Sequence, residues 1–272
     1  MDDGAGSEGE VRVALSPRPE GGVLASVTIA RPTKLNTLTP GLMRRLIAEL
    51  GTLGAREDLR AVVLTGEGPK AFVGGADIGT MAAIEDGAGA ESFIRLVHGC
   101  CAAVRDCPVP VIARVNGWTL GAGLELAAAC DLRIAAAHAR FGMPEVRVGI
   151  PSVVEAALLP SLIGWGRTRR LLLLGETIDA AEAAAWGLVE RVVAEEALDA
   201  AVEAWVADLC AAGPQAIRTQ KALIRRWEDL PTSDAIAAGI PAFASAWRTD
   251  EPRRMMRGFL DRPRAAKPQA GG

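Results

Sequence analysis

The first half of the chain alternates short apolar runs with longer stretches in which apolar and polar residues follow a helical period. The runs that predict strands are Val11–Leu15, Val23–Ala30, Leu59–Thr65, Val109–Val115 and Leu132–Ala136. The stretches that predict helices are Pro40–Leu53, Gly87–Asp106 and Leu120–Ala129. Because nearly continuous apolar strands alternate with helices, the pattern indicates an α/β core whose strands are largely buried.

The second half, after Pro151, turns helical. The segments that predict helices are Val153–Ile163, Gly166–Leu174, Ala180–Trp186, Ala197–Ala211, Pro214–Trp227, Ser233–Trp247 and Pro252–Asp261, with one strand predicted at Leu188–Val193. No linker rich in proline, glycine or serine divides the halves. We therefore expect a disordered lead (1–10), an α/β core (11–194), a C-terminal helical region (195–262) and a flexible tail (263–272).

Composition and charge narrow the classes of protein. The chain has 272 residues, half of them hydrophobic, and a formal net charge of −3. It has no basic stripe, so nucleic acid is not an expected partner, and no apolar run is long enough to predict a membrane span. The acidic, glycine-rich start is unlike a signal or transit peptide. The five cysteines match no metal motif and fit small buried side chains in a reducing cytosol, so a cytoplasmic location is expected.

Two glutamates stand in settings that give a carboxylate a chemical role. Glu125 closes the run Asn116–Glu125, and Glu145 closes the run Arg140–Glu145; both are surrounded by small and apolar residues. Burying an unpaired carboxylate is costly, so such a placement needs a reason. Two carboxylates that meet in one pocket can adopt opposite protonation states and divide acid and base work.

Two glycine-containing segments can present backbone N–H groups to a ligand. Gly74 and Gly75 follow a predicted strand and lead to Asp77, which can cap the next helical turn. The segment Gly121–Glu125 stands at the start of a predicted helix, where N–H groups are free. One N–H from each segment can form an oxyanion hole. The alternatives are an ordinary strand-to-helix turn and close helix–sheet packing by small residues.

Together these segments resemble the crotonase superfamily of acyl-CoA enzymes, and most closely its enoyl-CoA hydratases. The similarity spans about Val11 to Arg262, and the segments that carry it are Ala71–Ile78, Val115–Glu125, Phe141–Glu145, Leu173–Ile178 and Ala185–Val189. The resemblance implies a spiral of ββα units with a helical C-terminal trimerisation region. It also implies a homotrimer, or a hexamer made of two trimers.

The resemblance further implies roles for particular residues. Backbone N–H groups of Ala76 and Ala122 would hold the thioester carbonyl oxygen, and Lys34 would contact coenzyme A, whose adenine end would lie near Ala71–Ile78. The residues expected to bind substrate are Lys34, Ala71, Gly74, Gly75, Asp77, Ile78, Gly121 and Ser152. No metal and no separate cofactor is implied, since coenzyme A enters as part of the acyl-CoA substrate.

The glutamates match the acid–base positions of the hydratases, whereas family members that only shift a double bond often retain just the later one. Carrying both favours hydration of a 2-enoyl-CoA. In this scheme an ionised Glu125 deprotonates water for attack at Cβ, and a protonated Glu145 delivers a proton to Cα. The alternatives are a crotonase-fold isomerase, hydrolase or lyase, and a non-catalytic CoA-binding relative.

Ser152 and Glu155, which both follow Glu145 in the chain, depart from the family pattern. Ser152 stands where hydratases are typically glycine, and Glu155 adds a third carboxyl for which we expect a structural or peripheral role. His98 is likewise expected to be structural or solvated. These departures leave the length, branching and polarity of the acyl group open.

Overall fold

The computed structural model describes residues 8–261, which form two compact units that divide after Ala211. The sequence placed the boundary between residues 194 and 195. In the structure helix α7 (Leu198–Ala211) lies before the division and belongs to the first unit. Glu10, which the prediction placed in the lead, belongs to the first strand. Residues 1–7 of that lead and the predicted tail 263–272 lie outside the described residues.

A six-stranded sheet forms the centre of the first unit. Its strands, in spatial order, are β1 (Glu10–Pro17), β2 (Val23–Ala30), β3 (Leu59–Gly66), β5 (Val111–Val115), β7 (Leu132–Ala136) and β10 (Arg191–Val193). β1 pairs antiparallel with β2, and the remaining neighbours are parallel. All five strands predicted in the first half are therefore confirmed, with ends that differ by two residues or fewer.

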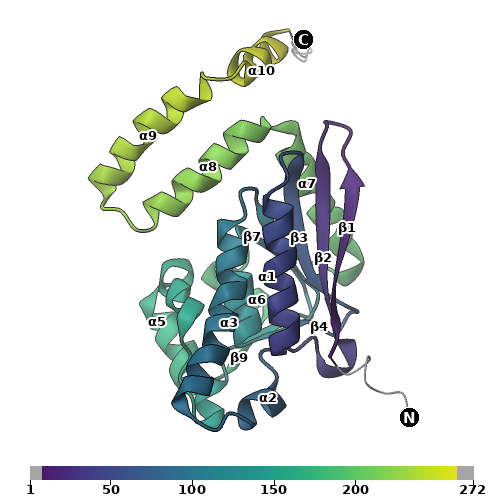
Figure 1. Ribbon diagram of the computed structural model, residues 1–272, viewed down its shortest axis with the longest axis vertical. Coiled ribbons are helices and arrows are strands. Elements are labelled where there is room, and N and C mark those ends of the chain that lie inside the picture. The colour runs from purple at the N-terminus through teal and green to yellow at the C-terminus, as the bar shows by residue number, and fades with distance from the viewer. Residues whose placement is uncertain (1–7, 262–272) are drawn as a thin grey trace, which may run out of the picture. The chain divides into compact units, whose positions relative to one another are not determined.

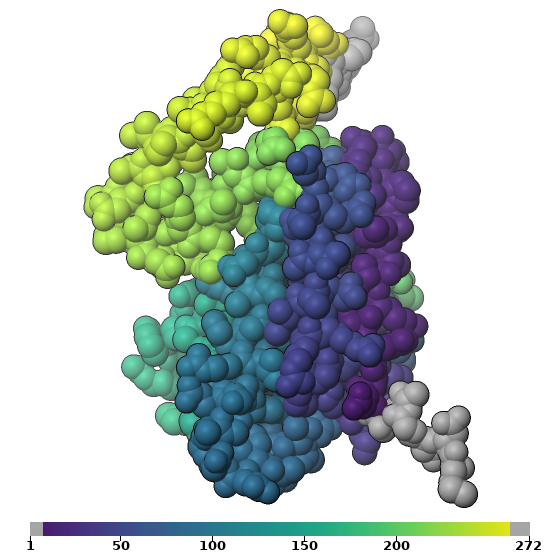
Figure 2. Space-filling model, viewed as in Figure 1, coloured from purple at the N-terminus to yellow at the C-terminus, as the bar shows by residue number. Residues whose placement is uncertain are grey.

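Helices α1 (Pro40–Gly54) and α3 (Gly87–Asp106) lie side by side over one face of this sheet (Figure 1). α1 begins as predicted, since the Thr39 side chain accepts a hydrogen bond from the Leu42 N–H and Pro40 occupies the first turn. Its apolar residues recur at helical spacing and point into the core, and Figure 2 shows the side chains of both helices closing over this face.

Helix α7 covers the opposite face of the sheet. Its buried residues Leu198, Val202 and Val206 pack in one cluster with Val63 of β3 and Ile112 of β5. This burial explains why α7 belongs to the first unit although the sequence pattern grouped it with the later helices.

A second, four-stranded sheet was absent from the sequence prediction. Its strands, in spatial order, are β4 (Ala71–Val73), β6 (Trp118–Leu120), β8 (Arg140–Gly142) and β9 (Thr177–Asp179). Each has three residues, which is too short to show the alternation by which strands are recognised. Successive strands enter the large and then the small sheet before a helix follows, which confirms the predicted spiral of ββα units.

Helix α4 (Ala122–Ala129) is the element of the spiral that lies deepest in the core. All eight of its residues are buried, and Glu125 is its one charged residue. The helix lies so close to β4 that a methyl group at Gly123 would overlap the carbonyl oxygen of Val73. The two preceding residues that we had assigned to this helix belong instead to β6 and to the turn at Gly121.

The remaining elements complete the two units. In the first unit they are α2 (Ile78–Ala82), the short 3-10 helices η1 (Pro32–Lys34), η2 (Glu145–Val148), η3 (Val154–Leu158) and η4 (Glu195–Ala197), α5 (Leu159–Leu174) and α6 (Ala180–Trp186). In the second they are α8 (Pro214–Trp227), α9 (Thr232–Ala246) and α10 (Glu251–Leu260). Within the described range 8–261, no helix is long and apolar enough to cross a membrane.

The contact between α4 and β4 generates a prediction about stability. Gly123→Ala forces the helix away from the Val73 carbonyl, so we expect it to lower the free energy of unfolding by about 1–3 kcal/mol. Gly51→Ala, in the exposed part of α1 with open space around it, is the matched control and should stabilise by ~0.5–1 kcal/mol. Denaturant titrations at one protein concentration measure both; equal effects would contradict the close packing.

Candidate active site

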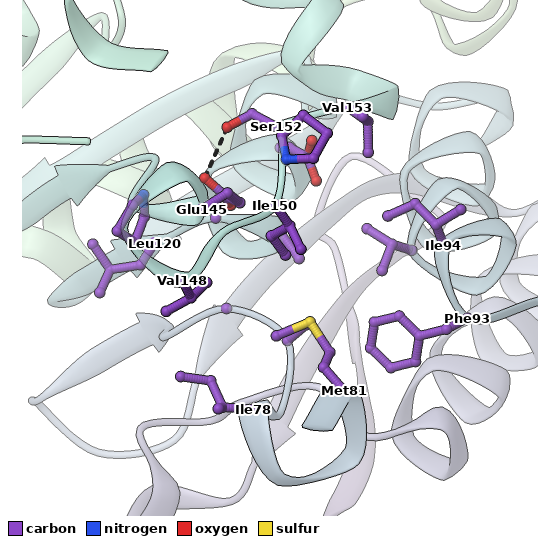
Figure 3. A pocket seen from close by; sticks show the side chains of 18 of the residues that line it. Ile78, Met81, Phe93, Ile94, Leu120, Glu145, Val148, Ile150, Ser152 and Val153 are labelled. Carbon is purple, nitrogen blue, oxygen red and sulfur yellow. Dashed lines mark hydrogen bonds between the residues drawn. The ribbon is translucent and has the colours of Figure 1, made fainter. Parts of the chain in front are cut away.

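A cavity of about 280 Å³ opens in the first unit, where the small sheet meets α3, α4 and the segment after β8. It collects residues from four separate parts of the chain. These are Gly74, Gly75, Ala76, Ile78, Met81, Phe93, Ile94, Val97, Leu120, Gly121, Ala122, Glu125, Pro144, Glu145, Arg147, Val148, Ile150, Pro151, Ser152 and Val153. Figure 3 shows Glu145 and Ser152 on one side of this cavity and Met81, Phe93 and Ile94 on another.

The first backbone N–H predicted to act as a donor belongs to Ala76, which lines the cavity. Ala76 forms an isolated parallel bridge with Leu38, in which the Leu38 N–H donates to Gly75 and the Leu38 carbonyl accepts from Asp77. In this pattern the bonds to Leu38 come from the residues on either side of Ala76, so the N–H of Ala76 itself points away from Leu38. Gly75, at φ 107°, supplies the backbone conformation that makes this turn possible.

The second backbone N–H predicted to act as a donor belongs to Ala122, which also lines the cavity and is the first residue of α4. An N–H in this position has no partner within its own helix. Gly121 precedes it at φ 51° and ψ −122°, a conformation that side chains rarely allow. A methyl group at Gly121 would also overlap Oε1 of Glu145, so glycine here serves both the turn and the carboxyl beside it.

Glu125 extends from the first turns of α4 into the cavity and is only 4% exposed. Its Oε1 accepts a hydrogen bond from the Ala156 N–H at 3.2 Å. Burial and the nearby Glu145 raise the pKa of Glu125 to about 8, although the Ala156 hydrogen bond acts in the opposite direction. Glu155 adds a smaller repulsion of the same sign as Glu145.

Glu145 opens η2 and is less deeply buried than Glu125. Its Oε2 accepts a hydrogen bond from the Ser152 hydroxyl at 2.8 Å (Figure 3). Burial raises the pKa of Glu145, while hydrogen bonds from its own backbone N–H and from Ser152 favour the ionised form. Ser152, which replaces the glycine typical of the resembled hydratases, thus acts directly on one of the two carboxyls.

The two carboxyls therefore have different environments within one cavity. Glu125 is more buried and faces the repulsion of two other carboxyls, whereas Glu145 receives a hydroxyl hydrogen bond. These surroundings favour a proton on Glu125 and a charge on Glu145 when no ligand is bound. The scheme predicted from the sequence, with Glu125 ionised and Glu145 protonated at the start of the reaction, concerns the state with substrate bound and stays a prediction.

Three of the residues expected to bind substrate do not line the cavity. Lys34 is exposed at the end of η1, and Ala71 is buried in β4. Asp77 caps α2 as predicted, by accepting from the Thr80 N–H, and its Oδ2 is 2.6 Å from Nη1 of Arg31. The Arg31 guanidinium keeps the pKa of Asp77 below its usual value. The other expected binding residues, Gly74, Gly75, Ile78, Gly121 and Ser152, all line the cavity.

Two asparagines that sequence reasoning missed hold strand β4 in place, and β4 leads into the turn at Gly74 and Gly75. The buried Asn36 and Asn116 both donate from Nδ2 to the carbonyl oxygen of Ala71, at 2.8 and 3.0 Å. Asn36 comes shortly after η1, and Asn116 comes directly after β5. That both bind the same carbonyl oxygen on β4 is visible only in three dimensions. The apolar residues of α2 and α3 that face the cavity were missed for the same reason.

The chain has the crotonase fold, and comparisons with known proteins identify its family. The family model described as enoyl-CoA hydratase/isomerase matches residues 20–267. The chain therefore belongs to the enoyl-CoA hydratase/isomerase family, and the resemblance read from the sequence motifs is confirmed.

Relatives and a solved structure agree with this assignment. The putative enoyl-CoA hydratase/isomerase YngF of Bacillus subtilis is 35% identical, over 89% of this chain and 93% of that protein. The short-chain-enoyl-CoA hydratase of Clostridium acetobutylicum is 34% identical, over 89% and 92%. The crystal structure of an enoyl-CoA hydratase from Bacillus anthracis superposes with a TM-score of 0.86 at 29% identity, over 92% of this chain and 96% of that one.

The buried carboxyl predicts a pH-dependent cost in stability. Because the pKa of Glu125 is raised from 4.5 to about 8, the folded protein binds this proton more tightly than the unfolded chain does. Folded-state stability is therefore lost progressively as the pH rises through that window. Glu125→Gln removes the ionisable group, so its unfolding midpoint relative to the unsubstituted protein should increase from pH 5 to pH 8.

The matched control for this measurement is Glu91→Gln. Glu91 is exposed and pairs with Arg95 on α3, so its removal should leave the difference in midpoint unchanged over the same pH range. A difference for Glu125→Gln that is flat with pH would contradict the raised pKa.

Proposed function

We propose that this protein is an enoyl-CoA hydratase, which adds water reversibly across the 2,3 double bond of a 2-enoyl-CoA thioester. The observation that carries the proposal is the meeting of Glu125 and Glu145 in one cavity with the backbone N–H groups of Ala76 and Ala122. An acid, a base and an oxyanion site are the groups that this addition requires.

The backbone donors would act on the thioester carbonyl. As the nucleophile adds at Cβ, electron density moves through the former double bond to the carbonyl oxygen and gives it enolate character. Hydrogen bonds from Ala76 and Ala122 would stabilise this developing charge, and such donors are worth about 3–4 kcal/mol each in related chemistry. Both donors belong to backbone fixed by tight turns, so they need little rearrangement.

The carboxyl pair would carry the protons. A water molecule adds its oxygen to Cβ and gives one proton to the ionised carboxylate, while the protonated carboxyl gives its proton to Cα. The pair ends with the same total number of protons with which it began. Because the two groups interact, the titration belongs to the pair, and their protein surroundings favour the proton on Glu125.

The remaining wall of the cavity fits an acyl chain. Met81, Phe93, Ile94 and Val97 line it from α2 and α3. Large apolar side chains that are also exposed line it as well, namely Ile78, Val148, Ile150 and Val153. Exposed apolar residues around a cavity are typical of a ligand site. Coenzyme A would enter as part of the substrate, and the name of the Clostridium acetobutylicum relative supports a short acyl chain.

Crotonyl-CoA tests the proposal directly. We expect the purified protein to consume it, with loss of absorbance of the conjugated thioester. Glu125→Gln and Glu145→Gln should each lower kcat by several orders of magnitude and leave binding of crotonyl-CoA, measured by calorimetry, nearly unchanged, because each removes a proton-transfer group (each such group contributes roughly 10²–10⁴-fold).

The same variants distinguish the runner-up reaction. An isomerase that shifts a 3-enoyl-CoA to a 2-enoyl-CoA needs one carboxyl, so it would retain most activity in one of the two variants. Near-normal hydration in either variant would contradict the two-carboxyl mechanism. Binding of crotonyl-CoA by the unsubstituted protein without any turnover of it would contradict hydration of short chains.

We also propose that the protein is a homotrimer or a hexamer, and the second unit supplies the supporting observation. On α9, Ile236, Ile240 and Phe243 are 69%, 72% and 70% exposed and share one helical face. Other copies of the chain would cover this face.

Charging this face should dissociate the assembly. We expect the double substitution Ile240→Glu with Phe243→Glu to lower the mass measured by sedimentation to that of smaller species, because buried charges oppose association. Ile240→Leu with Phe243→Leu keeps the face apolar and should preserve the mass. A monomeric unsubstituted protein would contradict the proposal.

A further inference from the structure

A third carboxyl, that of Glu155, is next in sequence to the Ala156 donor of Glu125 but does not line the cavity. Glu155 is 8% exposed, and its Oε1 is 2.8 Å from Nδ1 of His98 on α3. An ionised carboxylate only accepts, so Nδ1 is then the donor. Among the residues that the structure describes, none donates a hydrogen bond to Oε2, which is fully buried. A buried carboxyl held at one oxygen is costly and needs a reason.

The position of Glu155 connects it to Glu125 through the backbone. Both Glu155 and Ala156 belong to η3, and the Ala156 N–H is the donor that Glu125 accepts. The preceding residue, Val154, has φ 39°, a left-handed conformation that is unfavourable for a β-branched side chain. Such a turn persists only where its surroundings fix it, and the His98–Glu155 contact joins it to the long helix α3.

We propose that Glu155, anchored by His98, is a positioning residue for Glu125. It would fix the strained turn that presents the Ala156 N–H to Glu125, and it would place a negative charge that disfavours a second negative charge on Glu125. This inference rests on the proposed function, in which Glu125 exchanges a proton with the substrate.

The charged and titratable groups around Glu125 come from three elements. Glu145 and Arg147 on η2 line the same cavity, with Arg147 donating to the Leu174 carbonyl. His98 and Cys101 lie on α3, where burial, followed by nearby carboxyls, raises the pKa of the Cys101 thiol so that it stays neutral. Glu155 lies on η3.

The strands packed on α4 carry no titratable side chain within their bounds Ala71–Val73 and Trp118–Leu120. Glu155 is therefore a neighbouring charge that can be removed without touching the cavity.

Glu155→Gln separates the charge of this residue from its geometry. The amide oxygen can still accept from His98, so the anchor is kept while the negative charge is lost. Ionised Glu125 then becomes easier to form, and the alkaline limb of the kcat/KM profile, where the pair loses its last proton, should move to lower pH. We expect a displacement of roughly half a unit to one unit.

His98→Ala tests the anchor. It removes the His98–Glu155 contact that joins α3 to η3, so the Ala156 donor should be held less firmly and kcat should fall, with KM little changed. Glu91→Gln is the matched control. It removes the carboxylate of an exposed ion pair with Arg95 on the same helix, so it should change neither kcat nor KM.

A purely structural contact predicts a different result. It lowers the thermal stability of both variants but leaves the alkaline limb of the folded Glu155→Gln protein where it was. That outcome, or a limb that moves equally in Glu91→Gln, would overturn the proposal. If Glu155→Gln does not fold, His98→Ala decides, and an unchanged kcat there would overturn the positioning role.

The protonation of Glu125 can also be followed without turnover. The infrared band of protonated carboxyls, recorded against pH in the unliganded protein and assigned with Glu125→Gln, should titrate at lower pH in Glu155→Gln. This measurement distinguishes the two proposals: absence of crotonyl-CoA hydration would contradict the proposed function, whereas an unmoved Glu125 titration would contradict the role of Glu155.

Discussion

The close approach of helix α4 to the short strand β4 is the constraint on which the site depends. Gly123 lies against the Val73 carbonyl with no room for a side chain, so the loop after β4 and the start of α4 are neighbours. This contact brings the N–H groups of Ala76 and Ala122 to one cavity although they are far apart in sequence. It also surrounds α4 with protein on every side, and Glu125 is therefore buried with the rest of the helix. Backbone donors and a perturbed carboxyl thus follow from one packing contact.

Burial has opposing consequences for the carboxyls. It destabilises their ionised forms, which costs folding free energy at neutral and alkaline pH, and it thereby keeps a proton available near neutrality. Hydrogen bonds distribute this effect unequally. Ser152 favours charge on Glu145, whereas Glu125 accepts a hydrogen bond from the Ala156 N–H and is repelled by the carboxyls of Glu145 and Glu155. A difference between acid and base can therefore arise from two residues of the same type, because their surroundings differ.

Much of this architecture was predictable from sequence because its signals are local. The capped helix α1, with Thr39 and Pro40 at its start, and the apolar strand β3 are read from periodicity and turn chemistry within a few residues. The glycine-containing segments and both glutamates were recognised through motifs. The small sheet was not, because three-residue strands have no period and pair only through contacts distant in sequence. The hydrogen bonds from Asn36 and Asn116 to the Ala71 carbonyl, and the one from Ser152 to Glu145, were missed for the same reason.

The departures from the family pattern affect the site through its supports. Ser152 adds a side-chain donor where the typical glycine has only its backbone, and it points at Glu145. Three residues later, Glu155 adds a carboxyl next to Ala156, whose N–H donates to Glu125. Ser152 stabilises a charge on Glu145, and Glu155 opposes a charge on Glu125. Both changes therefore favour the pair with Glu145 ionised and Glu125 protonated. Because neither replaces Glu125 or Glu145, we expect them to alter the pH range of the proposed reaction rather than its kind.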